Sequence, residues 1–118
     1  MTFGPRNCFY MKKTIVVRTS FEAVHAWPKC PFPSVQFLKW PHRHIFHVEA
    51  RAEIKEDRGI EFIILKRSLE AFISEKYKGK DLGVKSCEVM GEEVLAFFPE
   101  LNYISIFEDN ENGSIVEK

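Results

Sequence analysis

The sequence predicts an α+β domain in which a four-stranded antiparallel sheet carries two helices on one face. Two long segments rich in β-branched and aromatic residues come first. Two segments with helically spaced apolar residues follow, and two short β-like segments end the chain. The resulting order, β-β-α-α-β-β, is typical of a sheet covered by helices on one side. A chain of 118 residues has room for one such domain.

The first strand is expected at residues 12–27. Its alternation of apolar and polar residues is interrupted near Ser20, which indicates a bend or a bulge. Residues 28–41 hold four prolines and are expected to form a loop. A second strand follows at 42–55, and the segment Glu-Asp-Arg-Gly at 56–59 supplies the next turn.

Helical spacing of apolar residues follows this turn and ends before the glycine-containing segment 78–83. The expected helix lies within residues 60–77, and its apolar face consists of Leu65, Leu69, Phe72 and Ile73.

The second helix is expected to begin after Ser86, which is a suitable N-cap residue. Glu88 lies in its first turn, where the helix dipole favours negative charge. The helix runs to about Phe98 and is stopped by Pro99. The last two strands are expected at 102–108 and 114–118, with a turn at 109–113.

Composition excludes several classes of protein. The formal net charge is zero, so the clustered positive charge of a nucleic-acid-binding protein is missing, and no apolar run reaches the length of a membrane span. Three cysteines without a CxxC pair argue against a disulfide framework and fit the cytoplasm. Residues 1–10 lack periodicity and are interpreted as a leader before a single domain at 11–118. This leader is either disordered or untranslated, since Met11 is a second possible start.

Three of the four histidines lie where the first two strands meet. Side chains alternate along a strand, so His42 and His44 point to the same side about 7 Å apart, while Arg43 and His47 point to the other. A hairpin pairing would bring His25 beside them. Three neutral imidazoles leave the fourth position of a zinc ion open, as in catalytic sites. An HxH pair alone is weak, and on its own it more often marks a hydrated strand end.

The residues around these histidines resemble motifs of the 6-pyruvoyl tetrahydropterin synthase and 6-carboxytetrahydropterin synthase family. "FEAVH" at 21–25 and "HRHIFHVEA" at 42–50 are similar to the family's F-x-A-x-H and H-G-H-x-[YF]-x-V-x-V. Three further segments match family motifs in the same order: "RGIEFIILKRSL", "SCEVMGEEVL" and "ISIFEDNENGSIVE". The resemblance covers about residues 13–117. It implies the tunnelling fold, whose unit has this same β-β-α-α-β-β order.

The resemblance also implies roles for individual residues. It makes His25, His42 and His44 the ligands of a zinc ion, Glu108 the glutamate that anchors the pterin, and Glu88 the second-helix glutamate of the same pocket. One carboxylate can accept both adjacent N–H donors of a pterin or guanine edge. Without the resemblance, Glu108 reads as a solvated strand end and Glu88 as a charge of the first helical turn.

The resemblance further implies self-association. Units of the family associate side by side so that their sheets close into a barrel, which removes the exposed sheet edges. We therefore expect a homo-oligomer built from trimers or tetramers, with the pocket at a subunit boundary.

The departures from the family concern proton transfer. Its Asp-His relay is missing, because the segment between the helices contains no histidine and Asp81 is the only aspartate nearby. Cys30 lies twelve residues before His42, so its thiol either folds over the metal or sits on the surface. Cys87 would lie at a helix N-terminus, which lowers a thiol pKa, and is either reactive or a small core residue. Ile63 stands where the family has an Asp.

Three hypotheses follow. The first is a zinc-dependent lyase of the 6-pyruvoyl tetrahydropterin synthase type, acting on a pterin or purine-derived substrate such as dihydroneopterin triphosphate, with Cys87 or Cys30 moving protons. The second is a non-catalytic or differently specialised protein that binds a pterin, purine or deazapurine in the same pocket. The third is an assembly domain in which the histidines are incidental.

Overall fold

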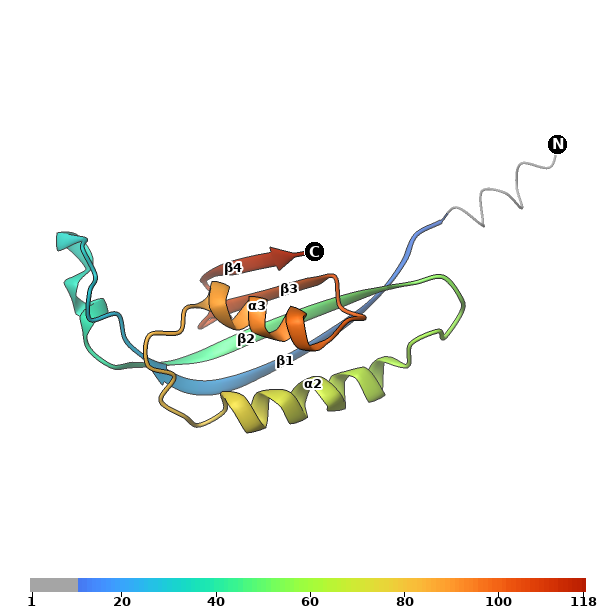
Figure 1. The fold of residues 1–118 in the computed structure, drawn as a ribbon, viewed down its shortest axis with the longest axis horizontal. Coiled ribbons are helices and arrows are strands. Elements are labelled where there is room, and N and C mark those ends of the chain that lie inside the picture. The colour runs from blue at the N-terminus through green and yellow to red at the C-terminus, as the bar shows by residue number, and fades with distance from the viewer. Residues whose placement is uncertain (1–10) are drawn as a thin grey trace.

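The computed structural model describes residues 11–118 and has the predicted α+β architecture (Figure 1). The leader interpreted at 1–10 lies outside the described residues. A four-stranded antiparallel sheet has the order β1-β2-β3-β4, so strands that follow one another in sequence are also neighbours in the sheet. The elements are β1 (Lys13–His25), η1 (Pro33–Lys39), β2 (His42–Ile54), α2 (Phe62–Lys76), α3 (Cys87–Phe97), β3 (Tyr103–Glu108) and β4 (Asn112–Glu117).

The hairpin of β1 and β2 has one uninterrupted register from Lys13 opposite Ile54 to His25 opposite His42. Of the two alternatives expected near Ser20, a bend or a bulge, the bulge is therefore wrong. The pattern was broken by Thr19, a polar residue on the side of the sheet that faces the helices. Its hydroxyl donates to Glu70 of α2 at 2.8 Å, which satisfies the polar group at that position.

We expected a loop throughout the connection between β1 and β2. The connection instead contains the 3-10 helix η1. Pro33 occupies the first turn of this helix, where its missing N–H costs nothing. The backbone N–H of Trp27 donates to the carbonyl of Leu38 at 2.7 Å and closes the connection at its base. Figure 1 shows that this segment extends beyond the end of the sheet.

Both helices cover the same face of the sheet. α2 packs against β1, and α3 packs against β3 and β4. Of the expected apolar face of α2, Leu65, Leu69 and Ile73 are buried and Phe72 is partly buried. α3 begins as predicted, with the Ser86 hydroxyl accepting from the N–H of Val89 at 3.1 Å. Among residues 11–118, no helix is long and apolar enough to cross a membrane.

The opposite face of the sheet carries a charged cluster on β1 and β2. Glu49 accepts hydrogen bonds from Arg18 Nε at 2.8 Å and Arg51 Nε at 2.7 Å. Burial raises the pKa of Glu49, but the two arginines outweigh burial and the net pKa is lowered. The guanidinium of Arg51 also lies 3.9 Å from the ring centre of Tyr103.

Glu49→Gln is expected to lower the free energy of unfolding by about 1 kcal/mol at neutral pH. A lowered pKa in the folded state stabilises the protein above the unfolded-state pKa, and this contribution disappears as the pH falls through the folded-state pKa. Urea unfolding of the metal-free proteins should thus show the difference at pH 7 and lose it in acid. Glu53→Gln is the control, because Glu53 is half-exposed and lies 3.5 Å from Lys12. A loss in Glu49→Gln that persists in acid would contradict the prediction.

Candidate metal centre

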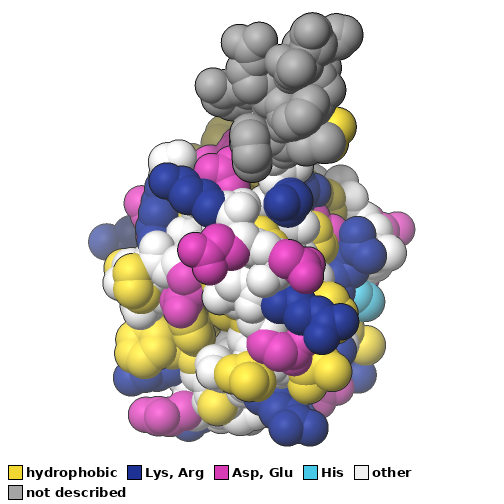
Figure 2. All heavy atoms as spheres, turned by 90° about the vertical axis from the view of Figure 1, so that its right-hand side faces the viewer, with side chains coloured by type: hydrophobic (Ala, Val, Ile, Leu, Met, Phe, Trp, Pro, Cys, Tyr) yellow, Lys and Arg dark blue, Asp and Glu magenta, His cyan; other side chains and the backbone are white. Residues whose placement is uncertain are grey.

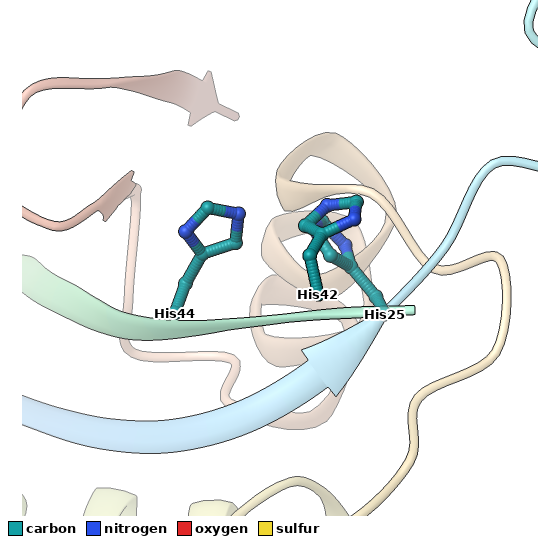
Figure 3. Close-up of side chains that lie close together, drawn as sticks. All are labelled: His25, His42 and His44. Atoms are coloured by element: carbon teal, nitrogen blue, oxygen red, sulfur yellow. The ribbon is translucent and has the colours of Figure 1, made fainter. Parts of the chain in front are cut away.

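The register of the β1–β2 hairpin brings the three histidines together. His25 is paired with His42, and His44 lies two residues further along β2 on the same face. One ring nitrogen from each of the three lies within 4.8 Å of the others. Figure 3 shows the three imidazoles on the same side of the hairpin. His47 has the other parity, and it lines a hollow on the sheet face that the helices leave uncovered.

The segment between the helices holds His25 in place. It runs along β1, where the N–H of Val24 donates to the Lys80 carbonyl at 3.0 Å and that of Ala26 to the Gly83 carbonyl at 2.9 Å. The positive φ of Gly83, 63°, lets the chain turn here. The Lys85 carbonyl then lies 2.8 Å from Nδ1 of His25.

All three histidines use Nδ1 for an orienting contact. The Nδ1 atoms of His25 and His42 lie 2.8 Å from the carbonyl oxygens of Lys85 and Trp40. A carbonyl oxygen only accepts, so Nδ1 of both residues carries the proton and Nε2 of the neutral ring keeps its lone pair. Metal-binding histidines are commonly oriented in this way.

His44 is held by Asp109, a residue that sequence analysis missed. Nδ1 of His44 lies 2.6 Å from Oδ2 of Asp109, and Oδ1 accepts from the N–H of Ile45 at 3.0 Å. Asp109 and Asn110 both have positive φ values, 53° and 59°, which side-chain-bearing residues adopt rarely. The signal available in the sequence was the Asp-Asn pair in a turn, but its contact with His44 is long-range.

The Nε2 atoms of His25 and His44 are buried and lack an aligned hydrogen-bond partner among the described residues. Phe46 lies under both rings, with centroid distances of 5.4 Å to His25 and 5.7 Å to His44. Buried polar atoms without partners are costly, and a bound cation would satisfy them. The three histidines therefore fit a metal ion such as zinc.

Glu108, at the end of β3, approaches the same nitrogens. Its Oε2 lies 3.0 Å from Nε2 of His25 and its Oε1 lies 3.5 Å from Nε2 of His44. Both distances are those of ion pairs, but neither contact has hydrogen-bond geometry. The contact with His25 lowers the pKa of Glu108 and raises that of His25 against the effect of burial.

A cavity of about 330 Å³ opens beside the histidines. Its polar side includes His25, His42 and both expected anchors, Glu88 and Glu108. Its apolar side, which sequence analysis missed, is formed by Trp27, Leu38 and Val84. The carboxylate of Glu88 accepts from the Ser114 hydroxyl at 2.8 Å.

The two expected reactive cysteines lie in different places. Cys87 lines a hollow with His25, Glu88 and Glu108 and is 6% exposed. Burial raises its pKa to about 12, and the two glutamates add to this, so the expected lowering by the helix N-terminus is wrong. Cys30 is 3% exposed and packs at the base of η1 with Sγ near the carbonyls of Phe32 and Val35, so the surface alternative for this thiol is also wrong.

Replacement of Asp109 is expected to weaken zinc binding by about 10- to 100-fold, because His44 loses the group that orients its ring. Asp109→Gly removes the carboxylate and tolerates the positive φ, so strain does not confuse the result. Competition titration with a chromophoric chelator measures the affinity. Asn110→Gly is the matched control, since it changes a neighbouring residue of the same conformation. Equal zinc affinity in Asp109→Gly and the unchanged protein would contradict the prediction.

Comparison with known proteins places the fold. No family model and no curated protein sequence matches the chain. Among solved structures, the 6-pyruvoyl tetrahydropterin synthase of Caenorhabditis elegans superposes with a TM-score of 0.72 at 13% identity, covering 92% of this chain and 96% of that one. An uncharacterized protein from Wolinella succinogenes gives 0.72 at 13% identity, covering 92% and 99%. The 6-pyruvoyl tetrahydropterin synthase of Plasmodium falciparum gives 0.62 at 17% identity, covering 91% and 98%. The chain thus has the predicted fold of these synthases over nearly its whole described length.

Proposed function

We propose that the chain is a zinc-dependent enzyme of the 6-pyruvoyl or 6-carboxytetrahydropterin synthase type. Its substrate would be a pterin or a purine-derived molecule such as dihydroneopterin triphosphate. The observation that carries the proposal is the convergence of three oriented imidazoles beside a cavity that contains two carboxylates. The shared fold with two 6-pyruvoyl tetrahydropterin synthases supports it.

His25, His42 and His44 would hold the metal. A bound zinc ion would act as a Lewis acid that polarises oxygens on the substrate side chain. The Nδ1 contacts keep the rings oriented with Nε2 toward the shared centre.

Glu88 and Glu108 would bind the heterocycle. Ionised carboxylates accept the adjacent ring N–H and exocyclic amine of a pterin or guanine edge in short, charge-assisted bonds. The indole of Trp27, on the apolar side of the cavity, offers a surface on which a flat ring can pack. The polar side of the cavity would therefore bind the edge of the heterocycle, and the apolar side would bind its face.

The thiols are the proposed proton carriers. Cys87 lies nearer to the chemistry, because it lines a hollow shared with Glu88 and Glu108. Its thiol stays protonated at neutral pH, which suits a proton donor better than a nucleophile. Cys30 is buried at the base of η1, so a role for it would require that segment to move.

A second candidate function is binding of a pterin, purine or deazapurine without this chemistry. It is favoured by the absence of a histidine between the two helices, since proton relays of the family's kind need one. The same metal and the same two glutamates would then serve recognition alone.

Incubation of zinc-loaded protein with dihydroneopterin triphosphate tests the choice. Loss of triphosphate or rearrangement of the side chain, followed by chromatography and absent in His42→Ala/His44→Ala, would support the enzyme. Binding of the compound without turnover would favour the second function. If the protein neither binds nor converts the compound, this substrate class is rejected.

We also propose that the chain is a cytoplasmic homo-oligomer built from trimers or tetramers. β1 and β4 form the two edges of the sheet, and exposed edges favour pairing with another chain. Figure 2 shows basic and acidic side chains interspersed on the face that it displays, which does not favour a nucleic acid as partner. Sedimentation that gives only a monomer would contradict the oligomer.

A further inference from the structure

The carboxylate of Glu108 lies against the metal-facing side of the histidine cluster. Its two oxygens lie 3.0 Å and 3.5 Å from the Nε2 atoms of His25 and His44, respectively. The side chain is 29% exposed, so it had room to turn toward solvent and the wider cavity. Its placement between the two imidazoles therefore calls for an attractive partner.

The contact between Glu108 and His25 argues for a cation at this point. Nδ1 of His25 contacts the Lys85 carbonyl oxygen, which leaves Nε2 to face Oε2 of Glu108 at 3.0 Å. This contact lacks hydrogen-bond alignment, so an N–H···O bond does not account for the approach of the carboxylate. A metal ion between the two atoms would turn the contact into shared coordination.

The distances agree with this interpretation. Zinc binds imidazole nitrogen and carboxylate oxygen at about 2.0–2.2 Å, which places neighbouring ligand atoms of a tetrahedral site about 3.3 Å apart. The observed separations of 3.0 Å and 3.5 Å bracket that value. Glu88, in contrast, lines the cavity with its carboxylate held by the hydroxyl of Ser114.

We propose that Glu108 is the fourth protein ligand of the metal when no substrate is bound. The inference rests on the proposed zinc site and adds a second state to it. The same two oxygens cannot coordinate zinc and accept the donors of a heterocycle at once. Binding of the heterocycle would withdraw Glu108 from the metal and open the coordination position that the chemistry needs, so a vacant pocket would keep a closed metal site.

Cobalt(II) substitution with azide as a probe tests the inference. Cobalt reports its coordination through visible absorption, and azide binds to a metal position that is free or held by water. We expect azide at millimolar concentration to leave the spectrum of the unchanged protein as it is and to shift that of Glu108→Ala. Cobalt affinity should also fall by at least about tenfold in Glu108→Ala and Glu108→Gln.

Glu88→Gln is the matched control, because it removes a negative charge from the same cavity without touching the histidines. It should resist azide as the unchanged protein does. Circular dichroism would verify that each variant is folded, and the azide test on the unchanged protein needs no variant. Azide shifts in the unchanged protein and in Glu88→Gln would overturn the role of Glu108 and leave the histidine site intact. If the unchanged protein binds no cobalt, the proposed zinc site fails as well.

Discussion

Protein that carries both His42→Ala and His44→Ala is expected to lose zinc, whereas the unchanged protein, purified without chelators, should contain about one zinc per chain. Removing two of three imidazoles leaves His25 and a carboxylate, which cannot complete a tetrahedral site. We expect the zinc affinity to fall by more than about a thousandfold, since ligation supplies many kcal/mol of binding free energy. Elemental analysis after dialysis measures the stoichiometry.

His47→Ala is the control for this experiment. His47 lies on the same strand, only three residues after His44, but its side chain points to the face that the helices leave uncovered. It should therefore retain zinc. Thermal unfolding adds a second measurement, because a ligand that binds only the folded state raises the midpoint. Zinc should raise the midpoint of the unchanged protein and of His47→Ala, but not that of the double variant.

The alternative outcome is equally informative. If all three proteins lack metal, the proposed Lewis-acid chemistry is removed, and only the fold and the proposed assembly remain. If the double variant retains zinc, the metal is bound elsewhere and the histidine cluster is incidental.

The parts of the site that sequence could predict follow from local periodicity. Alternation along a strand sets the shared side of His42 and His44, and a hairpin pairing places His25 opposite. The N-cap at Ser86 was equally local, because it depends on the type of one residue at the start of a helical pattern.

The remaining parts depend on contacts between distant segments. Asp109 lies 65 residues from the histidine that it holds, and the Lys85 carbonyl lies 60 residues from His25. The expected pKa of Cys87 was wrong because burial and two carboxylates, which come from tertiary packing, outweigh the local effect of the helix end. Trp27 and Leu38 line the cavity together because the connection that carries η1 closes at its base, where the N–H of Trp27 donates to the carbonyl of Leu38.

A substitution at Gly113, where β4 lies close to β3, is expected to have the second large effect. Gly113, opposite Phe107, has no room for a side chain: an added Cβ would lie 2.1 Å from the carbonyl oxygen of Ile106 and 2.5 Å from Cα of Phe107. Both contacts are with backbone, which cannot rotate away as a side chain can. Gly113→Ala should therefore push β4 off β3 and lower the free energy of unfolding by about 2–4 kcal/mol.

This change would also reach the site. Ser114, the next residue, holds Glu88, and β3 carries Glu108 at its end, so a displaced β4 disturbs the cavity on its carboxylate side. The histidines lie on β1 and β2 and keep their hairpin register. Gly113→Ala is thus expected to bind zinc through the three histidines at moderate temperature while losing affinity for a guanine or pterin probe.

Urea unfolding and probe titration measure the two effects separately. Asn112→Ala is the control, because Asn112 is an exposed neighbour in the same strand and its change should alter stability by less than about 0.5 kcal/mol. A Gly113→Ala protein as stable as Asn112→Ala would show that β4 can shift without cost. In that case the spacing of β3 and β4 would not set the position of Glu88.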